Sequence, residues 1–248
     1  YGTVRDFVLG IKAVLADGTV VDFGGTVRKA TCGYDLKDLI IGSEGTLAII
    51  AEVTLALMSP PGYTLTLVAP FDTVRDAIDS VPAVLHSGIT PMAVEFVEHE
   101  TIRCAERLLE RTWPAREGDA SCMFVLDADD EDQAFGVAER LADVLEQHAA
   151  GEVLVATDSK QQRDILELRS TIYEALRPAT AELLDVCVPL SQIADHVGFV
   201  ASLAEAHDVQ LPTYGHAADG NVHTHLLSHR LHDGSIGEEI QGDDGLRL

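Results

Sequence analysis

Residues 121–149 read SCMFVLDADDEDQAFGVAERLADVLEQHA and hold the clearest strand-helix pair of this chain. The apolar run 121–126 is typical of a buried strand, and an acidic segment follows it. From residue 133 to residue 149 apolar side chains recur with the period of an α-helix, which predicts an amphipathic helix packed on a sheet. The apolar positions of this helix are Ala134, Val137, Ala138, Leu141, Val144 and Leu145.

The same alternation of strand and helix extends in both directions. Before this pair the pattern predicts strands at 64–69 and 91–97 and helices at 73–86 and 100–111, and Pro82 is expected to bend or split the first of these helices. After it the pattern predicts a strand at 152–157, a helix at 159–176, a buried strand at 183–188 and a helix at 192–206. Ser159 and Gln162 form a capping-box pattern at the start of the helix 159–176. The repetition predicts an α+β domain.

The first 58 residues show a different pattern. Strands are expected at 7–15 and 20–23, joined by an Asp17-Gly18 turn, followed by a short helix at 36–41 and a buried strand from residue 47 to residue 57. The run Pro60-Pro61-Gly62 is punctuation typical of a domain boundary. We therefore expect a first domain at 1–58, a second at 59–230 and an irregular tail at 231–248.

The segment 215–225, GHAADGNVHTH, is the densest in chemically active side chains. Asp219-Gly220-Asn221 predicts a tight turn and residues 222–227 a strand, so His223 and His225 lie on one strand face. His216 precedes the turn and is expected to fold back toward them. Such a cluster suits a divalent metal, because neutral imidazole is a favoured ligand. The alternative is a solvated pair of surface histidines.

Composition limits the classes of partner. The chain has 248 residues, with 41 acidic against 17 basic side chains and a net charge of −24. This balance argues against a nucleic-acid or anionic-membrane partner, and with few lysines it indicates a halophilic protein from a high-salt cytoplasm. Its four cysteines form no C-x-x-C motif, which is typical of reduced thiols in a reducing, cytoplasmic compartment. We expect no transmembrane segment, since no apolar run reaches about 18 residues.

Several motifs carry a family resemblance. They are YGTVRD at 1–6, Asp17-Gly18, CGYDL at 32–36, GSEGTL at 42–47 and the histidine segment at 215–223. In this order and spacing they resemble the FAD-linked oxidase family of the vanillyl-alcohol-oxidase superfamily, within it the branch of glycolate oxidase and D-lactate dehydrogenase. The resemblance implies the second half of a PCMH-type FAD-binding domain, followed by an α+β ferredoxin-like cap domain. It also implies an enzyme that oxidises a small 2-hydroxyacid to the 2-oxoacid by hydride transfer to FAD.

The resemblance also implies roles for particular residues. His216 and His223 become ligands of a divalent metal, Zn or Mn, Asn221 becomes a substrate contact, and His225 becomes a possible catalytic base or a substrate contact. Arg169 lies at the edge of an apolar stripe, where the residues alone favour a guanidinium reaching to solvent; the resemblance makes it the group that binds the substrate carboxylate. The implied flavin contacts are Gly33, Gly42, Ser43, Glu44, Gly45, Thr46, Ile49 and Ile50.

Substrate size and completeness follow from the same resemblance. Leu183 stands where a branch specific for hydroxyglutarate tends to carry lysine, which favours D-lactate or glycolate. The family's pyrophosphate loop, a further metal ligand and the base fall outside this sequence, so we expect a partial enzyme completed by an N-terminal half, with an unidentified electron acceptor and a possible homo-oligomer. Two alternatives stay open: a metal-dependent hydrolase that uses the histidine cluster, and a non-catalytic fragment of a split enzyme.

Overall fold

The computed structural model describes residues 2–240 and divides the chain into two compact units. Unit 1 is Tyr1–Pro60 and unit 2 is Pro61–Leu248, so the division falls between the two prolines of the Pro60-Pro61-Gly62 run. Each unit has its own hydrophobic core.

Unit 1 is a small antiparallel sheet covered on one side. The chain forms a 3-10 helix η1 (Val4–Phe7), strands β1 (Val8–Val14) and β2 (Val20–Gly24), helix α1 (Leu36–Ile40) and strand β3 (Ile49–Leu55). β1 lies in the middle of the order β2-β1-β3. Its inward side chains, with Ile40 of α1 and Ala48, form the core of the unit. Every residue of β3 is exposed, so the prediction of a buried strand here is wrong: β3 lies at an edge of the sheet and presents apolar side chains to its surroundings.

Unit 2 contains the remaining elements. Their bounds are β4 (Tyr63–Phe71), α2 (Val74–His86), β5 (Ala93–Glu98), α3 (His99–Leu109), β6 (Ala120–Ala128), α4 (Glu131–Glu146), β7 (Leu154–Ala156), α5 (Ser159–Leu176), η2 (Arg177–Ala179), β8 (Thr180–Cys187), η3 (Leu190–Gln192), α6 (Ile193–Ala206), β9 (Thr213–His216), β10 (Asn221–Leu227), β11 (His229–His232) and β12 (Ser235–Glu239).

A seven-stranded antiparallel sheet organises unit 2. Its order is β7-β4-β6-β5-β9-β10-β8. The first four strands and the helices α2 and α4 repeat a strand-helix-strand unit twice, and a strand of the other repeat lies between the two strands of each repeat. This is the interleaving of a ferredoxin-like domain, so the predicted cap architecture is confirmed. The hairpin β9-β10 and then β8 extend the sheet beyond β5.

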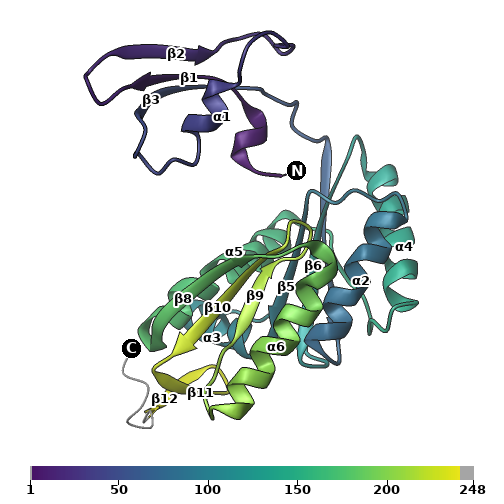
Figure 1. The fold of residues 1–248 in the computed structure, drawn as a ribbon. Helices are drawn as coiled ribbons and strands as arrows, with labels where there is room; N and C mark the ends of the chain where they lie inside the picture. The colour runs from purple at the N-terminus through teal and green to yellow at the C-terminus, as the bar shows by residue number, and fades with distance from the viewer. Residues whose placement is uncertain (1, 241–248) are drawn as a thin grey trace. The chain divides into compact units, whose positions relative to one another are not determined.

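Helices cover both faces of this sheet (Figure 1). On one face α2, α4 and α6 pack over a core that includes Phe71, Phe96 and Phe124. On the other face α3 and α5 pack over a second core, which includes Trp113 and Leu168. These side chains are fully buried, and each contributes about 1.5–3 kcal/mol of apolar transfer free energy. The two-sided packing fixes the strands from which the histidine segment is built.

Local expectations about two helices need correction. The helix 73–86 is not split at Pro82: α2 runs from Val74 to His86 as one helix, because burial of Ile78, Val81 and Val84 offsets the backbone hydrogen bond that a proline removes, and the alternative of a bend stays a prediction. α5 covers the predicted residues, but Asp158 caps it by accepting from the backbone N–H groups of the next turn, while the side chain of Gln162 donates to Thr64 O instead of closing a capping box.

Two expectations about strands are also wrong. β8 is mostly exposed where a buried strand is predicted, because the sheet order places it at an edge. The segment 231–248, predicted to be irregular, contributes to a hairpin of β11 and β12, and residues 241–248 of that prediction lie outside the described residues. Leu231 packs this hairpin against the second core of unit 2.

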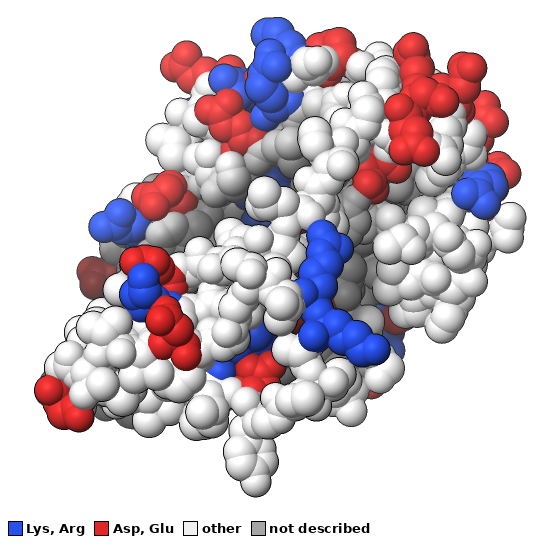
Figure 2. Space-filling model, turned by 90° about the horizontal axis from the view of Figure 1, so that it is seen from above, with Lys and Arg blue, Asp and Glu red and all other residues white. Residues whose placement is uncertain are grey.

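Charged side chains are spread over the surface in small groups. Figure 2 shows most of the visible Lys and Arg side chains standing beside Asp or Glu, in agreement with ion pairs such as Arg75 with Asp195 at 2.9 Å. Among residues 2–240 no helix is both long enough and apolar enough to cross a membrane.

Candidate functional site

A tight turn builds the centre of the site. The backbone N–H groups of Asp219 and Gly220 both donate to His216 O, and Asp219 Oδ1 accepts from Asn221 N at 3.1 Å. Gly220 has a φ of +89°, which a glycine adopts without strain. The turn places His216 directly opposite Asn221 on the neighbouring strand. The predicted return of His216 toward His223 is therefore confirmed.

The strand register gathers the polar side chains in two rows. Glu95 of β5 lies opposite His216 of β9. Tyr214 of β9 lies opposite His223 of β10, which in turn lies opposite Asp185 of β8. Because side chains two residues apart share a strand face, His216 and Tyr214 point to the same side of the sheet. That side is the one covered by α5.

Glu95 is the buried anion of the site. Its Oε2 accepts from Nη2 of Arg169 at 2.6 Å, and its Oε1 and Oε2 each lie 2.8 Å from Nδ1 of His216. The side chains of Glu95 and Arg169 are each 12% exposed. The hydrogen bond that His216 donates to Glu95 raises the pKa of His216 above its usual value, against the effect of burial. Nε of Arg169 is buried and has no hydrogen-bond partner within residues 2–240.

A second carboxylate holds the second imidazole. Nδ1 of His223 lies 3.2 Å from Oδ1 of Asp185, whose side chain is 58% exposed. Burial lowers the pKa of His223, and the charge of Asp185 only partly opposes this effect. The rings of His216 and His223 meet edge to face, with centroids 5.3 Å apart.

Tyr214 is buried and contacts both His223 and Arg169. The residue is 3% exposed, and its ring centroid lies 5.1 Å from that of His223 and 5.0 Å from Cζ of Arg169. The stacked guanidinium is a cation–π contact. Burial raises the pKa of the Tyr214 hydroxyl to about 12, so this group stays protonated at neutral pH.

His225 lies deeper than its predicted role suggests. The residue is fully buried, and its Nδ1 and Nε2 are hydrogen bonded to the hydroxyls of Thr180 at 2.8 Å and of Tyr214 at 3.2 Å. Burial lowers the pKa of the imidazole to about 4. In this placement both ring nitrogens are already engaged and no solvent reaches them. The catalytic role of His225 stays a prediction, and the geometry assigns the ring to holding Tyr214.

Gly215 sets the distance between the strands. A Cβ atom at this position would lie 2.2 Å from Asn221 O and 2.8 Å from Cε1 of Phe96. The missing side chain lets β9 fit closely between β5 and β10. The spacing of Glu95, His216 and His223 is therefore imposed by the main chain.

Two imidazole nitrogens of the site have the chemistry that suits a divalent metal. His216 and His223 use Nδ1 for a carboxylate, and Nε2 of each has no partner in the part of the chain that the structure describes. A carboxylate on one ring nitrogen, with the other nitrogen free, is how metal-binding histidines are oriented. Residues 2–240 contain no group of three or more His, Cys, Asp or Glu side chains arranged to hold a metal ion, and the role of His216 and His223 as metal ligands stays a prediction.

The residues predicted to contact a flavin lie in unit 1. Gly42, Glu44 and Gly45 have φ values of +87°, +52° and +78° in the turn between α1 and β3. Ser43 and Thr46 close this turn through a backbone hydrogen bond of 2.9 Å. The N–H groups of Glu44 and Gly45 have no partner among the described residues, which suits an anionic or carbonyl-bearing ligand.

The other predicted flavin contacts also face outward. At Gly33, which has a φ of +81°, a Cβ atom would meet no heavy atom within 4 Å. Ile49 and Ile50 begin β3 and are 69% and 39% exposed. An apolar group bound along β3 would cover them.

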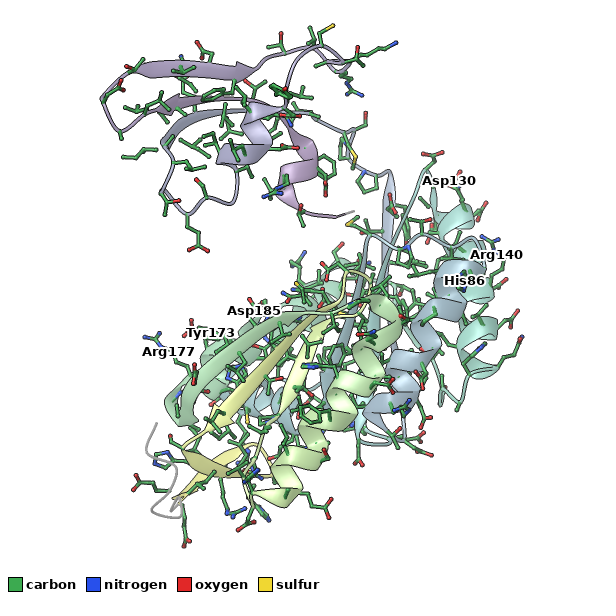
Figure 3. All side chains as sticks on the ribbon, viewed as in Figure 1. His86, Asp130, Arg140, Tyr173, Arg177 and Asp185 are labelled. Atoms are coloured by element: carbon green, nitrogen blue, oxygen red, sulfur yellow. The ribbon has the colours of Figure 1, made fainter. Side chains whose placement is uncertain are left out.

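Sequence reasoning missed several members of the site. Glu95, Asp185 and Tyr214 form its contacts, and Tyr173 of α5 adds a ring 6.1 Å from that of His225. A signal for Glu95 exists, since it is the one charged residue of the apolar stretch 93–97. In Figure 3 Asp185 and Tyr173 lie along the edge formed by β8 and α5, and the site lies between this edge and β5.

Solved structures define the class of fold. A structure of p-cresol methylhydroxylase with substrate bound matches 93% of this chain and 52% of its own, with a TM-score of 0.66 at 14% identity. A 4-ethylphenol oxidase from Gulosibacter chungangensis matches with a TM-score of 0.67, also at 14% identity, over 94% of this chain and 53% of its own. The predicted fold, the second half of a PCMH-type FAD-binding domain followed by an α+β cap, is confirmed.

The family follows from sequence. Residues 60–236 match the family model described as FAD linked oxidases, C-terminal domain, and the chain belongs to this family. It is 40% identical over 227 residues to a D-lactate dehydrogenase of Archaeoglobus fulgidus, covering 92% of this chain and 50% of that protein. It is 32% identical over 230 residues to the glycolate oxidase subunit GlcD of Bacillus subtilis, covering 90% and 47%. The chain spans about half the length of the curated relatives it matches.

Proposed function

We propose that the protein is a flavin-dependent dehydrogenase or oxidase of a small 2-hydroxyacid, D-lactate or glycolate. The observation that carries this proposal is the cluster on one face of the sheet in unit 2, where a guanidinium and two imidazoles with free Nε2 atoms surround Tyr214. A 2-hydroxyacid has a carboxylate and an adjacent hydroxyl, and the cluster offers a cation for the first and a metal-binding pair for the second. The names of the relatives support the same class of substrate.

Arg169 would bind the substrate carboxylate. Its Nη2 is held by Glu95, while its Nη1 and buried Nε have no partner among the described residues. A carboxylate at this guanidinium would satisfy donors that the fold leaves open. Leu183, which lies opposite His225 in the strand register, adds no second charge to the site. This favours an acid with a single carboxylate.

His216 and His223 would hold a divalent cation, Zn or Mn, through Nε2. A bound cation lowers the pKa of a coordinated hydroxyl, and FAD accepts the hydride from the substrate carbon. The residues of this chain would orient the reactants: the hydrogen bond to Glu95 fixes the tautomer of His216, Asp185 lies 3.2 Å from Nδ1 of His223, Tyr214 excludes water beneath the rings, and Asn221 would contact the substrate. The turn at Gly42–Thr46 and the exposed start of β3 would contact the flavin.

One experiment tests this function. Flavin absorbance and dye-linked oxidation of D-lactate and glycolate would be measured for this chain alone and for the protein with any flanking sequence that its gene encodes. We expect the longer protein to bind FAD and to oxidise at least one of the two acids. If it binds no flavin and oxidises no 2-hydroxyacid, the proposal fails. Ester hydrolysis with bound zinc and without flavin would instead support the hydrolase alternative.

A second measurement tests the metal ligands. We expect His216→Ala and His223→Ala each to lose bound metal, measured by elemental analysis of the purified protein. A change at an exposed histidine such as His232→Ala serves as the control and should keep the metal. Unchanged metal content in both site variants would remove His216 and His223 as ligands.

A further inference from the structure

The proposed function uses the two contacts of Glu95 separately, one with Arg169 and one with His216. Glu95 joins three elements that are distant in sequence, since Arg169 of α5 lies 74 residues after it and His216 of β9 lies 121 residues after it. Both of its oxygens approach His216 Nδ1 at 2.8 Å, and one of them also accepts from Arg169 at 2.6 Å. A single buried carboxylate is therefore shared by the predicted anion-binding group and a predicted metal ligand.

Burial makes this sharing consequential. A carboxylate in an apolar strand is costly unless it is hydrogen bonded, and here the two donors that stabilise it both belong to the site. Because Nδ1 of His216 donates to Glu95, the lone pair of the imidazole lies on Nε2 and faces the position of the metal. The same carboxylate neutralises Arg169 and holds its guanidinium over the ring of Tyr214 at 5.0 Å.

The negative charge of Glu95 interacts with both Arg169 and His216. When Arg169 donates a charge-assisted hydrogen bond, it withdraws electron density from the acceptor that also orients His216. A change at Arg169 is thus transmitted to Nε2 of His216 without any contact between the two side chains being needed. Asp185 cannot play this part, because its contact in the described structure is with His223 alone and it is more than half exposed.

We propose that Glu95 is a positioning residue that couples the anion-binding Arg169 to the metal-binding His216. This inference rests on the proposed function for the identity of the two ligands, and it adds an energetic coupling between two contacts that the proposed function treats separately. It predicts that the affinity for metal depends on Arg169 in the absence of any substrate, and that the dependence disappears without Glu95.

The test is a double-mutant cycle read out by metal binding alone. The purified wild type, Glu95→Gln, Arg169→Met and the double variant are freed of metal with a chelator and titrated with Zn²⁺, and then with Mn²⁺. We expect Glu95→Gln to weaken binding by about 10- to 100-fold, the range for a residue that orients a metal ligand. We expect the two changes to be non-additive by about fivefold or more in Kd. Additivity within about twofold would overturn the coupling.

Two further variants keep the test decisive. Glu95→Asp retains the charge but is one methylene shorter, so it is expected to reach one partner and to lose the coupling; a wild-type coupling in this variant would contradict the proposal. Should Glu95→Gln fail to fold, as judged by circular dichroism, Glu95→Asp decides the matter. The matched control is Glu167→Gln. Glu167 lies on the same helix as Arg169, and the change removes its exposed ion pair with Arg111. This variant is expected to bind metal as the wild type does.

Steady-state kinetics distinguishes a positioning role of Glu95 from a role in stability alone. At saturating metal, Glu95→Gln is expected to recover kcat to within about threefold, because mass action restores the metal, while KM for the 2-hydroxyacid stays raised because Arg169 has lost its anchor. If His216→Ala loses metal but the Glu95 variants do not, the inference fails and the proposed function stands. If His216→Ala and His223→Ala both keep their metal, the proposed metal site itself fails.

Discussion

The two halves of the histidine cluster use the same arrangement at different depths. In one half Glu95 holds His216, and in the other Asp185 holds His223, in both cases from the facing position on a neighbouring strand. The Glu95 side chain is 12% exposed and that of Asp185 is 58% exposed. The hydrogen bond raises the pKa of His216, whereas burial of the ring outweighs the exposed carboxylate and lowers the pKa of His223.

The difference shows how the position of a strand in the sheet affects the strength of a carboxylate–imidazole pair. β5 lies inside the sheet, where low polarity strengthens each electrostatic contact, and α5 adds a cation to Glu95. β8 lies at the edge, where water competes for Asp185. We infer a rigid half of the site around His216 and an adaptable half around His223.

The largest expected effect comes from removing the cation of the rigid half. Arg169→Met leaves Glu95 buried with an imidazole as its remaining partner, and should lower the free energy of unfolding by about 3 kcal/mol. The double variant with Glu95→Gln should recover a large part of this loss, since no uncompensated charge remains. Urea unfolding of the three proteins measures both quantities. A loss below about 0.5 kcal/mol for Arg169→Met would mean that the pair is not buried in solution.

The next effect concerns a carboxylate of the same strand that lacks such a cation. Burial raises the pKa of Glu98 to about 7, against a hydrogen bond from Thr213. Because the unfolded carboxyl ionises near its ordinary pKa of 4.5 and the folded one only near 7, its contribution to stability is lost as the pH rises through this window. Glu98→Gln mimics the protonated form.

The Glu98→Gln variant should therefore be more stable than the wild type at pH 8, by about 1–2 kcal/mol after allowance for the partial exposure of the side chain. The difference should vanish at about pH 4. Thermal unfolding at the two pH values measures it, and a difference that is the same at both values would contradict the assignment.

A smaller effect on stability is expected at Tyr214, beneath the imidazole rings. Tyr214→Phe keeps the ring contact with His223 but removes the hydrogen bond to Nε2 of His225, and should cost about 1 kcal/mol. The affinity for metal should change little, because neither carboxylate contact is altered. Chemical denaturation measures the stability of this variant and a Zn²⁺ titration its affinity for metal. A large loss of metal would show that Tyr214 also orients the histidines.

The smallest effect is expected in the adaptable half. Asp185→Asn keeps an acceptor for His223 in a solvated position, and should change the stability by no more than about 0.5 kcal/mol and the affinity for metal by less than about threefold. This variant is the direct counterpart of Glu95→Gln. If Asp185→Asn weakens metal binding as much as Glu95→Gln does, the distinction between the two halves is wrong.

Local patterns in the sequence predicted most of the elements. The bounds of α5 and the alternation in β10 follow from the side chains of those segments alone, and the turn at Asp219-Gly220-Asn221 brings His216 back as expected. Ser159 and Asp158 are adjacent residues of similar capping ability, so the pattern could not decide between them. The exposure of β8 depends on the strand order, which no local pattern contains.

The candidate site could be predicted only in part. The histidines stand together in one short segment and are recognisable there, whereas the partners of Glu95 lie 74 and 121 residues away. Their meeting requires the seven-stranded order and the crossing of α5, which are properties of the packed domain. His225 likewise has a partner on another strand, Thr180. The position of His225 in the motif does not reveal this contact.

The close approach at Gly215 bears on any attempt to transplant this site. Since the neighbouring main chain occupies the place of a side chain there, the separation of β5, β9 and β10 is a property of the scaffold and does not depend on the histidine side chains. A designer could therefore exchange the two histidines for other side chains while the strands keep their separation. A graft of the histidines that omits the glycine would begin from strands that stand too far apart.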